Sequence, residues 1–369
     1  MQLSSLATLG RIAAFASLAA ADAASDLSAA LSGYPQLNDL RTLVDQLPSV
    51  VNTIIGDRGG VTVLAPNDDA FQTYAVTNDG VQLFNASRDF LTNLLSYHIL
   101  AADVTSSNFS SEKGITTPTL LQGQLYNNRS AGPEFVQTYG KDANGQVVYT
   151  RPSGGHGYVL SGGDADNVTL TALNHQWRRG FLHMIDGVLP LPKNCTETME
   201  DQPLLKTLSE SLEGTTIYDA IDTLANVTCL APTSDAFDAA GNPQSKLNTT
   251  EYGWLIREHV IAQPLYIDRL RDGQVLQSLR NTTIKVSMNA GDIYFNNAKV
   301  VKSNVITNNG VIYVLDKLLA ASPTGTSPSS TGTAPSSTAT KDSAAHGRIA
   351  VNPSSLAALV AGMLLLRWI

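Results

Sequence analysis

The stretch Val61-Thr-Val-Leu-Ala-Pro-Asn-Asp-Asp-Ala-Phe71 returns later in the chain as Val227-Thr-Cys-Leu-Ala-Pro-Thr-Ser-Asp-Ala-Phe237, with eight of eleven positions identical. Its first four residues are mostly apolar and β-branched, which predicts a buried strand. The Ala-Pro pair ends that strand, because proline cannot donate to the ladder and disfavours helix at the residue before it. Asn67 or Thr233 then caps a helix that carries acidic residues in its first turn. We expect this strand-and-helix unit to occur twice.

Two further blocks repeat in the same order. Residues 94–99 (Leu-Leu-Ser-Tyr-His-Ile) correspond to residues 256–260 (Ile-Arg-Glu-His-Val), and each is a predicted helix end that carries a histidine. Residues 181–189 correspond to residues 311–319, both with an aspartate in a run of apolar residues. Three matches in one order indicate a duplicated domain.

The two copies differ in length, and most of the extra residues of the first copy follow its histidine. The Gly-, Asn- and Ser-rich segment 127–163 is expected to be an inserted surface excursion. Helical patterns occur at 37–47, 88–98 and 216–224, and strand-like patterns occur at 282–288, 293–295 and 310–315. Strands mixed with segregated helices predict an α+β fold in both copies.

The three blocks resemble the signature regions of fasciclin domains, over residues 31–192 and 204–321. The resemblance implies two tandem fasciclin-type domains, each a wedge-like β-sandwich with packed helices. Similar proteins include adhesion and matrix proteins of animals, plants and fungi. The C-terminal stalk and anchor signal described below are similar to those of fungal surface members.

The resemblance also offers a candidate partner-binding motif, Tyr97 followed by His98, because this region is linked to receptor binding in animal relatives. The second copy has Glu258 before His259, so it keeps half of the motif. We interpret both histidines as structural, each hydrogen-bonded to the backbone near a helix end.

Both ends of the chain are predicted to be targeting segments. Residues 1–23 are typical of a secretory signal peptide, with an apolar run before the cleavage motif Ala21-Asp22-Ala23. Residues 322–342 form a Ser/Thr/Pro-rich stalk, and 344–369 are predicted to be the propeptide of a glycosylphosphatidylinositol (GPI) anchor attached at Ser343. The apolar tail is too short for a transmembrane helix, which needs about 20 residues.

Charged residues make up 15% of the chain, which is low for a soluble protein and implies another source of surface hydration. Covalent sugar is the predicted source, because Asn-x-Ser/Thr sequons recur between the two targeting segments. The eight sequons lie at Asn85, Asn108, Asn128, Asn167, Asn194, Asn226, Asn248 and Asn281. Asn226 is the weakest of the eight, because it adjoins a predicted buried strand.

The chain has two cysteines, Cys195 and Cys229. An even pair in an oxidising compartment predicts one disulfide, which would contribute about 3 kcal/mol to stability. The alternative is two unrelated thiols, with Cys229 filling the core of a buried strand.

Common catalytic and nucleotide-binding motifs are absent from the sequence, including Gly-x-Ser-x-Gly, His-Glu-x-x-His and the Walker loop. His156, His175 and His183 do not have the spacing of metal ligands. The net charge of −8, with no basic run, argues against nucleic-acid binding. We therefore expect a protein that is not an enzyme and has neither a cofactor nor a metal.

The sequence thus predicts cell adhesion or cell-wall and matrix organisation. The expected partners are cell-surface or cell-wall glycoconjugates, or a second copy of the chain, with a lipid anchor in the outer face of the plasma membrane or transfer to the wall. The alternative is a module that binds a lipid or another small apolar ligand in a membrane compartment such as the vacuole.

Overall fold

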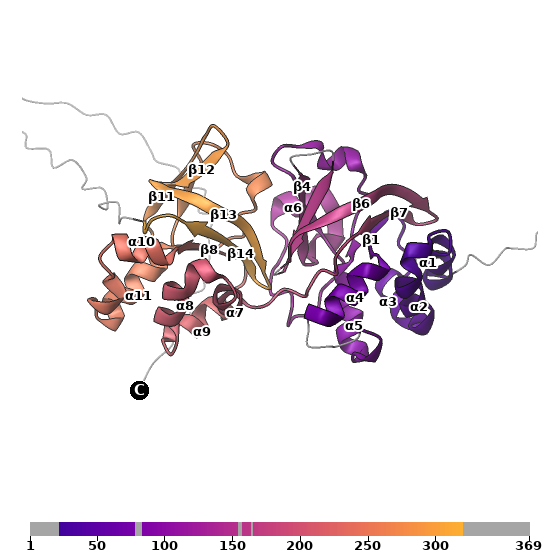
Figure 1. Cartoon of the computed structure of the whole chain (residues 1–369). Coiled ribbons are helices and arrows are strands. Elements are labelled where there is room, and N and C mark those ends of the chain that lie inside the picture. The colour runs from indigo at the N-terminus through magenta and orange to yellow at the C-terminus, as the bar shows by residue number, and fades with distance from the viewer. Residues whose placement is uncertain (1–21, 78–82, 154–156, 164, 320–369) are drawn as a thin grey trace, which may run out of the picture. The chain divides into compact units, whose positions relative to one another are not determined.

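The computed structural model describes residues 22–77, 83–153, 157–163 and 165–319. The predicted stalk, Ser343 and the apolar tail lie outside these residues, as does nearly all of the predicted signal peptide. Two α+β domains follow one another, each with a sandwich-like sheet of seven strands and a set of helices (Figure 1). The predicted α+β fold with two tandem domains is confirmed.

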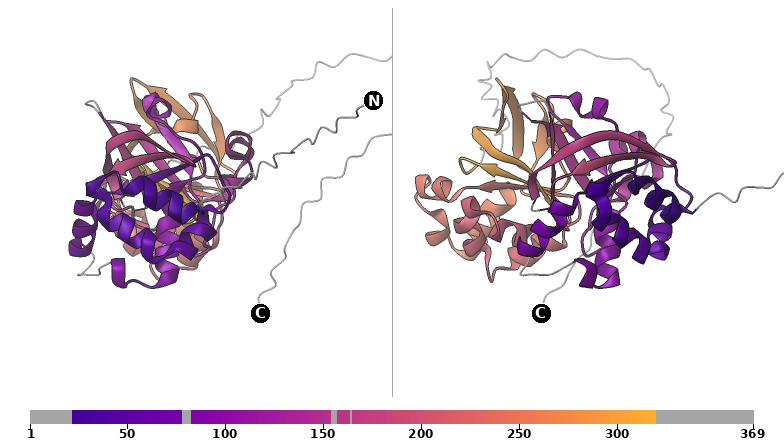
Figure 2. Two further views of the ribbon diagram at one scale, coloured as in Figure 1. Left: turned by 90° about the vertical axis from the view of Figure 1, so that its right-hand side faces the viewer. Right: turned by 45° about the vertical axis from the view of Figure 1, so that its right-hand side comes forward.

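Helices α1 to α5 of the first domain gather on one side of its sheet, in indigo and purple, whereas α6 lies apart from them beside β4 (Figures 1 and 2). The first domain contains α1 (Ala23–Leu31), α2 (Asn38–Gln46), α3 (Pro48–Ile55), β1 (Val61–Pro66), α4 (Asp68–Thr77), α5 (Arg88–Tyr97), β2 (Ile99–Leu100), β3 (Ile115–Pro118), α6 (Pro133–Tyr139), β4 (Val147–Pro152), β5 (Tyr158–Gly162), β6 (Ala165–Trp177) and β7 (Gly180–Ile185).

The second domain repeats this order of elements without a counterpart of α6. It contains α7 (Cys195–Glu200), α8 (Lys206–Leu212), α9 (Thr216–Thr223), β8 (Val227–Pro232), α10 (Ser234–Ala239), α11 (Thr249–Glu258), β9 (Val260–Ile261), β10 (Val275–Gln277), β11 (Thr283–Asn289), β12 (Asp292–Phe295), β13 (Ala298–Thr307) and β14 (Gly310–Leu315). The helices and strands predicted from the sequence are confirmed within a residue or two at each end.

The three repeated blocks become neighbours in each sheet. The strand order is β2-β1-β7-β6-β5-β4-β3 in the first domain and β9-β8-β14-β13-β12-β11-β10 in the second, so the two sheets share one topology. Strand β1 pairs in parallel with β7, from Val61 opposite Gly180 to Pro66 opposite Ile185, while β2 pairs antiparallel with its other edge. The strands of the repeated blocks therefore lie side by side at one end of each sheet.

The predicted helix caps are confirmed in both domains. The Asn67 side chain accepts the backbone N–H of Ala70 at 2.8 Å, and the Thr233 hydroxyl accepts that of Ala236 at 3.1 Å. Each bond satisfies a backbone donor that the first helical turn leaves free. The strand therefore ends and the helix begins within three residues.

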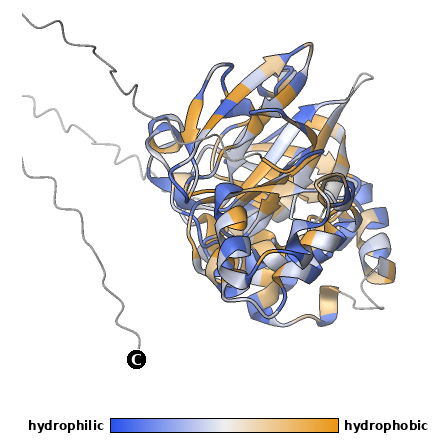
Figure 3. Ribbon diagram, turned by 90° about the vertical axis from the view of Figure 1, so that its left-hand side faces the viewer, coloured by the Kyte–Doolittle hydropathy of each residue, from blue (hydrophilic) through white to orange (hydrophobic). Residues whose placement is uncertain are grey.

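Strand β14 shows how the second domain is packed on both faces of its sheet. Ile312 and Val314 belong to a cluster with the helices, whereas Val311, Tyr313 and Leu315 belong to a cluster on the opposite face. Successive side chains of a strand point to opposite faces, so a strand buried on both faces is apolar along most of its length. The helices, in contrast, carry both hydrophobic and hydrophilic residues (Figure 3).

The insertion of the first domain overlaps the predicted segment only in part, over residues 127–146. The expected segment 127–163 contains β4 and β5, which are regular strands of the sheet. Most of the added residues lie in the connection 119–146 between β3 and β4, which replaces the short link 278–282 between β10 and β11. The predicted boundaries were wrong because two short strands, β4 and β5, lie within a segment of loop-like composition. We call residues 119–146 the insertion.

Helix α1 begins at the predicted signal cleavage site. Asp22 caps the helix by accepting the backbone N–H of Ser25 at 2.8 Å, and Ala23 and Ala24 are buried. Cleavage after Ala23 would separate the cap from its helix, whereas cleavage before Asp22 would keep it. Within the described residues no helix is long and apolar enough to cross a bilayer.

Candidate functional site

The insertion packs against the second domain through Phe135 of α6. Phe135 is 4% exposed, and its ring meets that of Tyr266 edge to face with the centroids 5.6 Å apart. Phe135, Ala143 and Tyr149 share one apolar cluster with residues of the second domain such as Leu265. The insertion therefore helps to close the face of the second sheet that the helices leave uncovered.

Two arginines hold the Phe135 ring between them and the core. The guanidinium of Arg269 lies 3.9 Å from the ring centroid, and that of Arg129 lies 5.0 Å from it. Glu134 pairs with Arg269 at 3.4 Å and with Arg271 at 3.6 Å. Glu134 and Arg271 are largely exposed, so these ion pairs add at most about 1 kcal/mol each. The cation–π contacts and the buried ring carry more of the attachment.

Hydrogen bonds also join the two domains. The Asp268 carboxylate accepts the backbone N–H of Thr116 at 3.0 Å and its hydroxyl at 2.5 Å. Thr116 lies in β3, the edge strand of the first sheet, so Asp268 covers part of an open edge. The Gln146 side-chain amide donates to the carbonyl oxygens of Thr307 and Asn308, at 3.1 and 3.3 Å.

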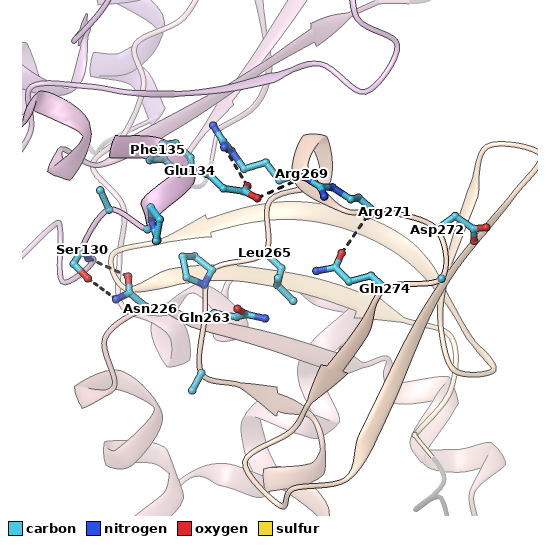
Figure 4. A pocket seen from close by; sticks show the side chains of 16 residues that line it. Ser130, Glu134, Phe135, Asn226, Gln263, Leu265, Arg269, Arg271, Asp272 and Gln274 are labelled. Carbon is cyan, nitrogen blue, oxygen red and sulfur yellow. Dashed lines mark hydrogen bonds and ion pairs between the residues drawn. The ribbon is translucent and has the colours of Figure 1, made fainter. Parts of the chain in front are cut away.

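A groove of about 830 Å³ lies where the insertion meets the second domain (Figure 4). Residues 130–135 form one wall, 262–265 lie across from them, and Arg269 with 271–274 completes the other wall. Asn226 stands at one end, beside Ser130. The groove exists because the insertion docks, so a domain without it would have no such wall.

The lining combines apolar surfaces with planar polar groups. Pro133, Pro264 and Leu265 supply apolar contact, while Gln263 and Arg271 carry amide and guanidinium donors. A sugar ring presents C–H groups on its faces and hydroxyls at its edge, so this mixture is complementary to an oligosaccharide. An apolar small molecule with a few polar groups would fit the same description. Among the described residues that line the groove, the carboxylates are Glu134, paired with two arginines, and Asp272, whose oxygen accepts the Met288 N–H at 2.8 Å.

The two repeated histidines are structural, as predicted. His98 Nδ1 lies 2.8 Å from the Leu94 carbonyl oxygen, and its Nε2 accepts the backbone N–H of Leu189 at 3.0 Å. His259 makes the same pair of bonds, to Leu255 at 2.9 Å and from Leu319 at 2.9 Å. Burial lowers the pKa of each imidazole to about 4. Each histidine thus ties a helix end to the segment after the last strand of its domain.

The candidate partner-binding pair Tyr97 and His98 is buried. Tyr97 is 0% exposed, and its hydroxyl donates to the Val147 carbonyl oxygen at 3.0 Å. A partner could reach either side chain only after the end of α5 opened. The burial of both favours a structural role for this motif.

The eight sequon asparagines differ in exposure. Asn85, Asn108, Asn248 and Asn281 are exposed; Asn128, Asn194 and Asn226 are half-buried; Asn167 lies in β6, with its side chain outside the described atoms. The side-chain oxygens of Asn108, Asn194 and Asn248 accept backbone N–H groups as helix caps, at 2.8 to 3.0 Å. A sugar attaches through the nitrogen, so these caps and a glycan are compatible.

The structure brings the two cysteines together. Cys195, at the start of α7, and Cys229, in β8, are free thiols whose Sγ atoms lie 3.0 Å apart in the core. Burial raises the pKa of the Cys195 thiol well above its ordinary value. The disulfide itself stays a prediction.

His175 and His183, the other described histidines, each have a separate hydrogen-bond partner. His175 Nδ1 lies 2.9 Å from the Tyr34 hydroxyl, and His183 Nε2 lies 2.8 Å from the Val104 carbonyl oxygen; His156 is outside the described residues. In the part of the chain that the structure describes, no group of three acidic, histidine or cysteine side chains could hold a metal ion.

Sequence reasoning missed the groove. The signal in the sequence was the unequal spacing of the repeats, which showed that an insertion exists but not where it docks.

Comparison with known proteins gives matches along most of the chain. The model of the Fasciclin domain family matches residues 35–192 and 203–321. A "Fasciclin-like arabinogalactan protein" of Arthroderma benhamiae is 25% identical over 305 residues, which cover 80% of this chain and 66% of that protein. "Fasciclin-like arabinogalactan protein elcF" of Phaeosphaeria nodorum is 27% identical over 308 residues, covering 82% of this chain and 91% of that protein.

A third relative is named for a biosynthesis cluster. "Aurofusarin biosynthesis cluster protein S" of Gibberella zeae is 37% identical over 243 residues, which cover 63% of this chain and 53% of that protein.

Proposed function

The chain belongs to the fasciclin-domain family, and on that premise we propose that it is a glycosylated cell-surface protein that acts in cell adhesion or in cell-wall organisation. The observation that carries the proposal is the pair of complete fasciclin domains, each matched by the family model. The fungal relatives named fasciclin-like arabinogalactan proteins align with both domains and support a role at the cell surface.

The proposed attachment to the cell is a GPI anchor at Ser343, carried on the Ser/Thr/Pro-rich stalk. A stalk of this composition cannot bury a core and would hold the two domains away from the membrane. Many copies on one cell would bind together, so weak individual contacts would still hold surfaces to each other.

The proposed partner is a surface or wall glycoconjugate that lies in the groove. The apolar surface of Pro133 and Pro264 would contact sugar faces, and the side chains of Gln263 and Arg271 would bind hydroxyls. Contact between two copies of the chain is the other route to adhesion, and the same experiment separates the two.

Beads coated with the glycosylated ectodomain, which is the chain without its predicted signal peptide and anchor propeptide, test the proposal. We expect them to attach to cells of the source organism in larger numbers than beads coated with an unrelated glycoprotein. Clumping of ectodomain beads with one another would indicate contact between copies. Equal counts for both kinds of bead, in attachment and in clumping, would refute adhesion.

The relative named for the aurofusarin biosynthesis cluster favours a second candidate function, the binding of a small apolar molecule. The groove could hold such a molecule against Leu265 and the two prolines. Organic extraction of the protein purified from its own organism, followed by mass spectrometry, tests this candidate. A stoichiometric small molecule would support it, and an empty protein that also fails to take up apolar dyes would oppose it.

A further inference from the structure

Asn226 and Ser130 form a two-point contact across the end of the groove (Figure 4). Asn226 Oδ1 accepts the backbone N–H of Ser130 at 3.0 Å, and Asn226 Nδ2 donates to the Ser130 hydroxyl at 2.7 Å. Ser130 belongs to the insertion of the first domain, and Asn226 directly precedes β8 of the second. The contact therefore fastens one domain to the other.

The backbone of Asn226 is shaped for this contact. Its φ of 57° lies in the left-handed region, which asparagine adopts more readily than other residues with a side chain. This turn presents the whole amide edge, oxygen and nitrogen together, to a single residue. Both groups of that edge are used by Ser130.

A sugar would be attached at the same edge of the amide. N-glycosylation replaces one hydrogen of Nδ2, and the amide becomes a secondary amide. The substituent of a secondary amide lies on the same side as the carbonyl oxygen, as in a trans peptide bond. The hydrogen on that side is the one that can reach Ser130 while Oδ1 accepts from the same residue. A glycan on Asn226 and the two-point contact with Ser130 are therefore mutually exclusive.

We propose that Asn226 stays unglycosylated in the folded protein and acts as a latch that fastens the insertion to the second domain. The proposal rests on the proposed function only in requiring that the chain passes through the N-glycosylation machinery. The Asn226-Val227-Thr228 sequon is then a structural motif, and a glycan installed there opens the latch and lies in the groove. An empty Asn226 keeps the groove accessible to a partner.

Asn248 provides the matched comparison. Its Oδ1 accepts the Glu251 backbone N–H at 3.0 Å, and its Nδ2 has no hydrogen-bond partner among the described residues. Asn248 is also exposed at the start of α11. A sugar on this nitrogen leaves its cap intact, so Asn248 is expected to be occupied where Asn226 is not.

Site-by-site occupancy in the secreted ectodomain tests the first half of the proposal. Enzymatic removal of N-glycans in heavy-oxygen water marks each occupied asparagine, and peptide mass spectrometry reads the mark. We expect the mark at Asn248 and none at Asn226. If Asn248 is marked, equal occupancy of Asn226 would overturn the proposal.

Hydrogen exchange at the Ser130 amide tests the second half. Replacement of the latch, Asn226→Gln, is expected to raise exchange at this amide by roughly tenfold, because the bond to Oδ1 is lost. Asn226→Asp keeps an acceptor oxygen and is expected to retain most of the protection. Asn85→Gln, which removes an exposed sequon elsewhere, is the control and should leave Ser130 unchanged.

The two experiments distinguish a failure of the latch from a failure of the proposed function. If no sequon is marked, glycosylation fails as part of the proposed function, and the exchange arm alone decides the latch. Unchanged exchange at Ser130 in Asn226→Gln would overturn the latch whatever the occupancy.

Discussion

His98 and His259 hold equivalent positions in the two domains, and each uses both ring nitrogens. Nδ1 faces a carbonyl oxygen and therefore carries the proton, while Nε2 accepts a backbone N–H. A second proton on the ring would place two donors against each other in a buried site. This geometry agrees with the pKa of about 4 that burial imposes.

Stability is expected to fall on acidification between pH 6.5 and about 4. The unfolded histidines take up a proton near pH 6.5 and the folded ones only near 4, so protons favour the unfolded chain in this window. The loss approaches roughly 3 kcal/mol for each histidine. The raised pKa values of Asp222 and Glu258, which burial causes, act in the opposite direction. Urea unfolding at several pH values measures the sum.

The variant His98→Gln isolates one of these contributions. We expect it to be less stable than the native chain at pH 7, because two buried hydrogen bonds are disturbed. Its stability should also fall less steeply between pH 6.5 and 4, because one titrating ring is gone. An unaltered slope would mean that His98 is not the titrating group.

Helix α6 is the element that distinguishes the first domain from the second. It has seven residues, too few for a stable isolated helix, so its packing holds it in place. The Phe135 ring faces the second domain, while the neighbouring Val136 is 48% exposed. One side of the helix thus supplies the contact, and the other side faces solvent.

The substitution Phe135→Ala is expected to destabilise the protein by about 3 to 4 kcal/mol, because it leaves a cavity among Tyr266 and its neighbours. The matched control Val136→Ala should change stability by no more than about 0.5 kcal/mol. Equilibrium unfolding in urea gives both values. Similar effects of the two substitutions would contradict the docking of α6 described here.

Features that depend on neighbouring residues in the sequence could be predicted from the sequence alone. Asn67 and Thr233 were identifiable as caps from their place after a strand-ending proline, and the histidines from their repeated place at a helix end. The docking of α6 was not predictable, because one aromatic residue in a seven-residue helix does not say which surface will cover it. Strands β4 and β5 were missed because their few apolar residues are flanked by glycine and serine.

The two domains are held together by contacts beyond the connector that links them in sequence. The apolar cluster around Phe135 and Tyr266 draws residues from both, and Asp268 and Gln146 add buried or half-buried hydrogen bonds. Domains in one chain move independently by default unless a substantial apolar interface joins them. The described part of the chain has such an interface.

We therefore expect the ectodomain to unfold in one calorimetric transition, with the calorimetric and van't Hoff enthalpies in agreement. The substitution Asp268→Ala removes the acceptor of two bonds from Thr116 and should lower the transition temperature. Two well-separated transitions in the native ectodomain would show that the domains fold independently.

The measurement that tests the central claim most directly is the attachment of coated beads to cells after the groove is filled. Ala262 is exposed and lines the groove, and Ala239, the last residue of α10, is exposed outside it. Ala262→Trp is expected to reduce attachment to the level of an unrelated glycoprotein, whereas Ala239→Trp should attach like the native ectodomain, with all three unfolding at similar temperatures. Undiminished attachment by Ala262→Trp would contradict the claim that this groove binds the partner.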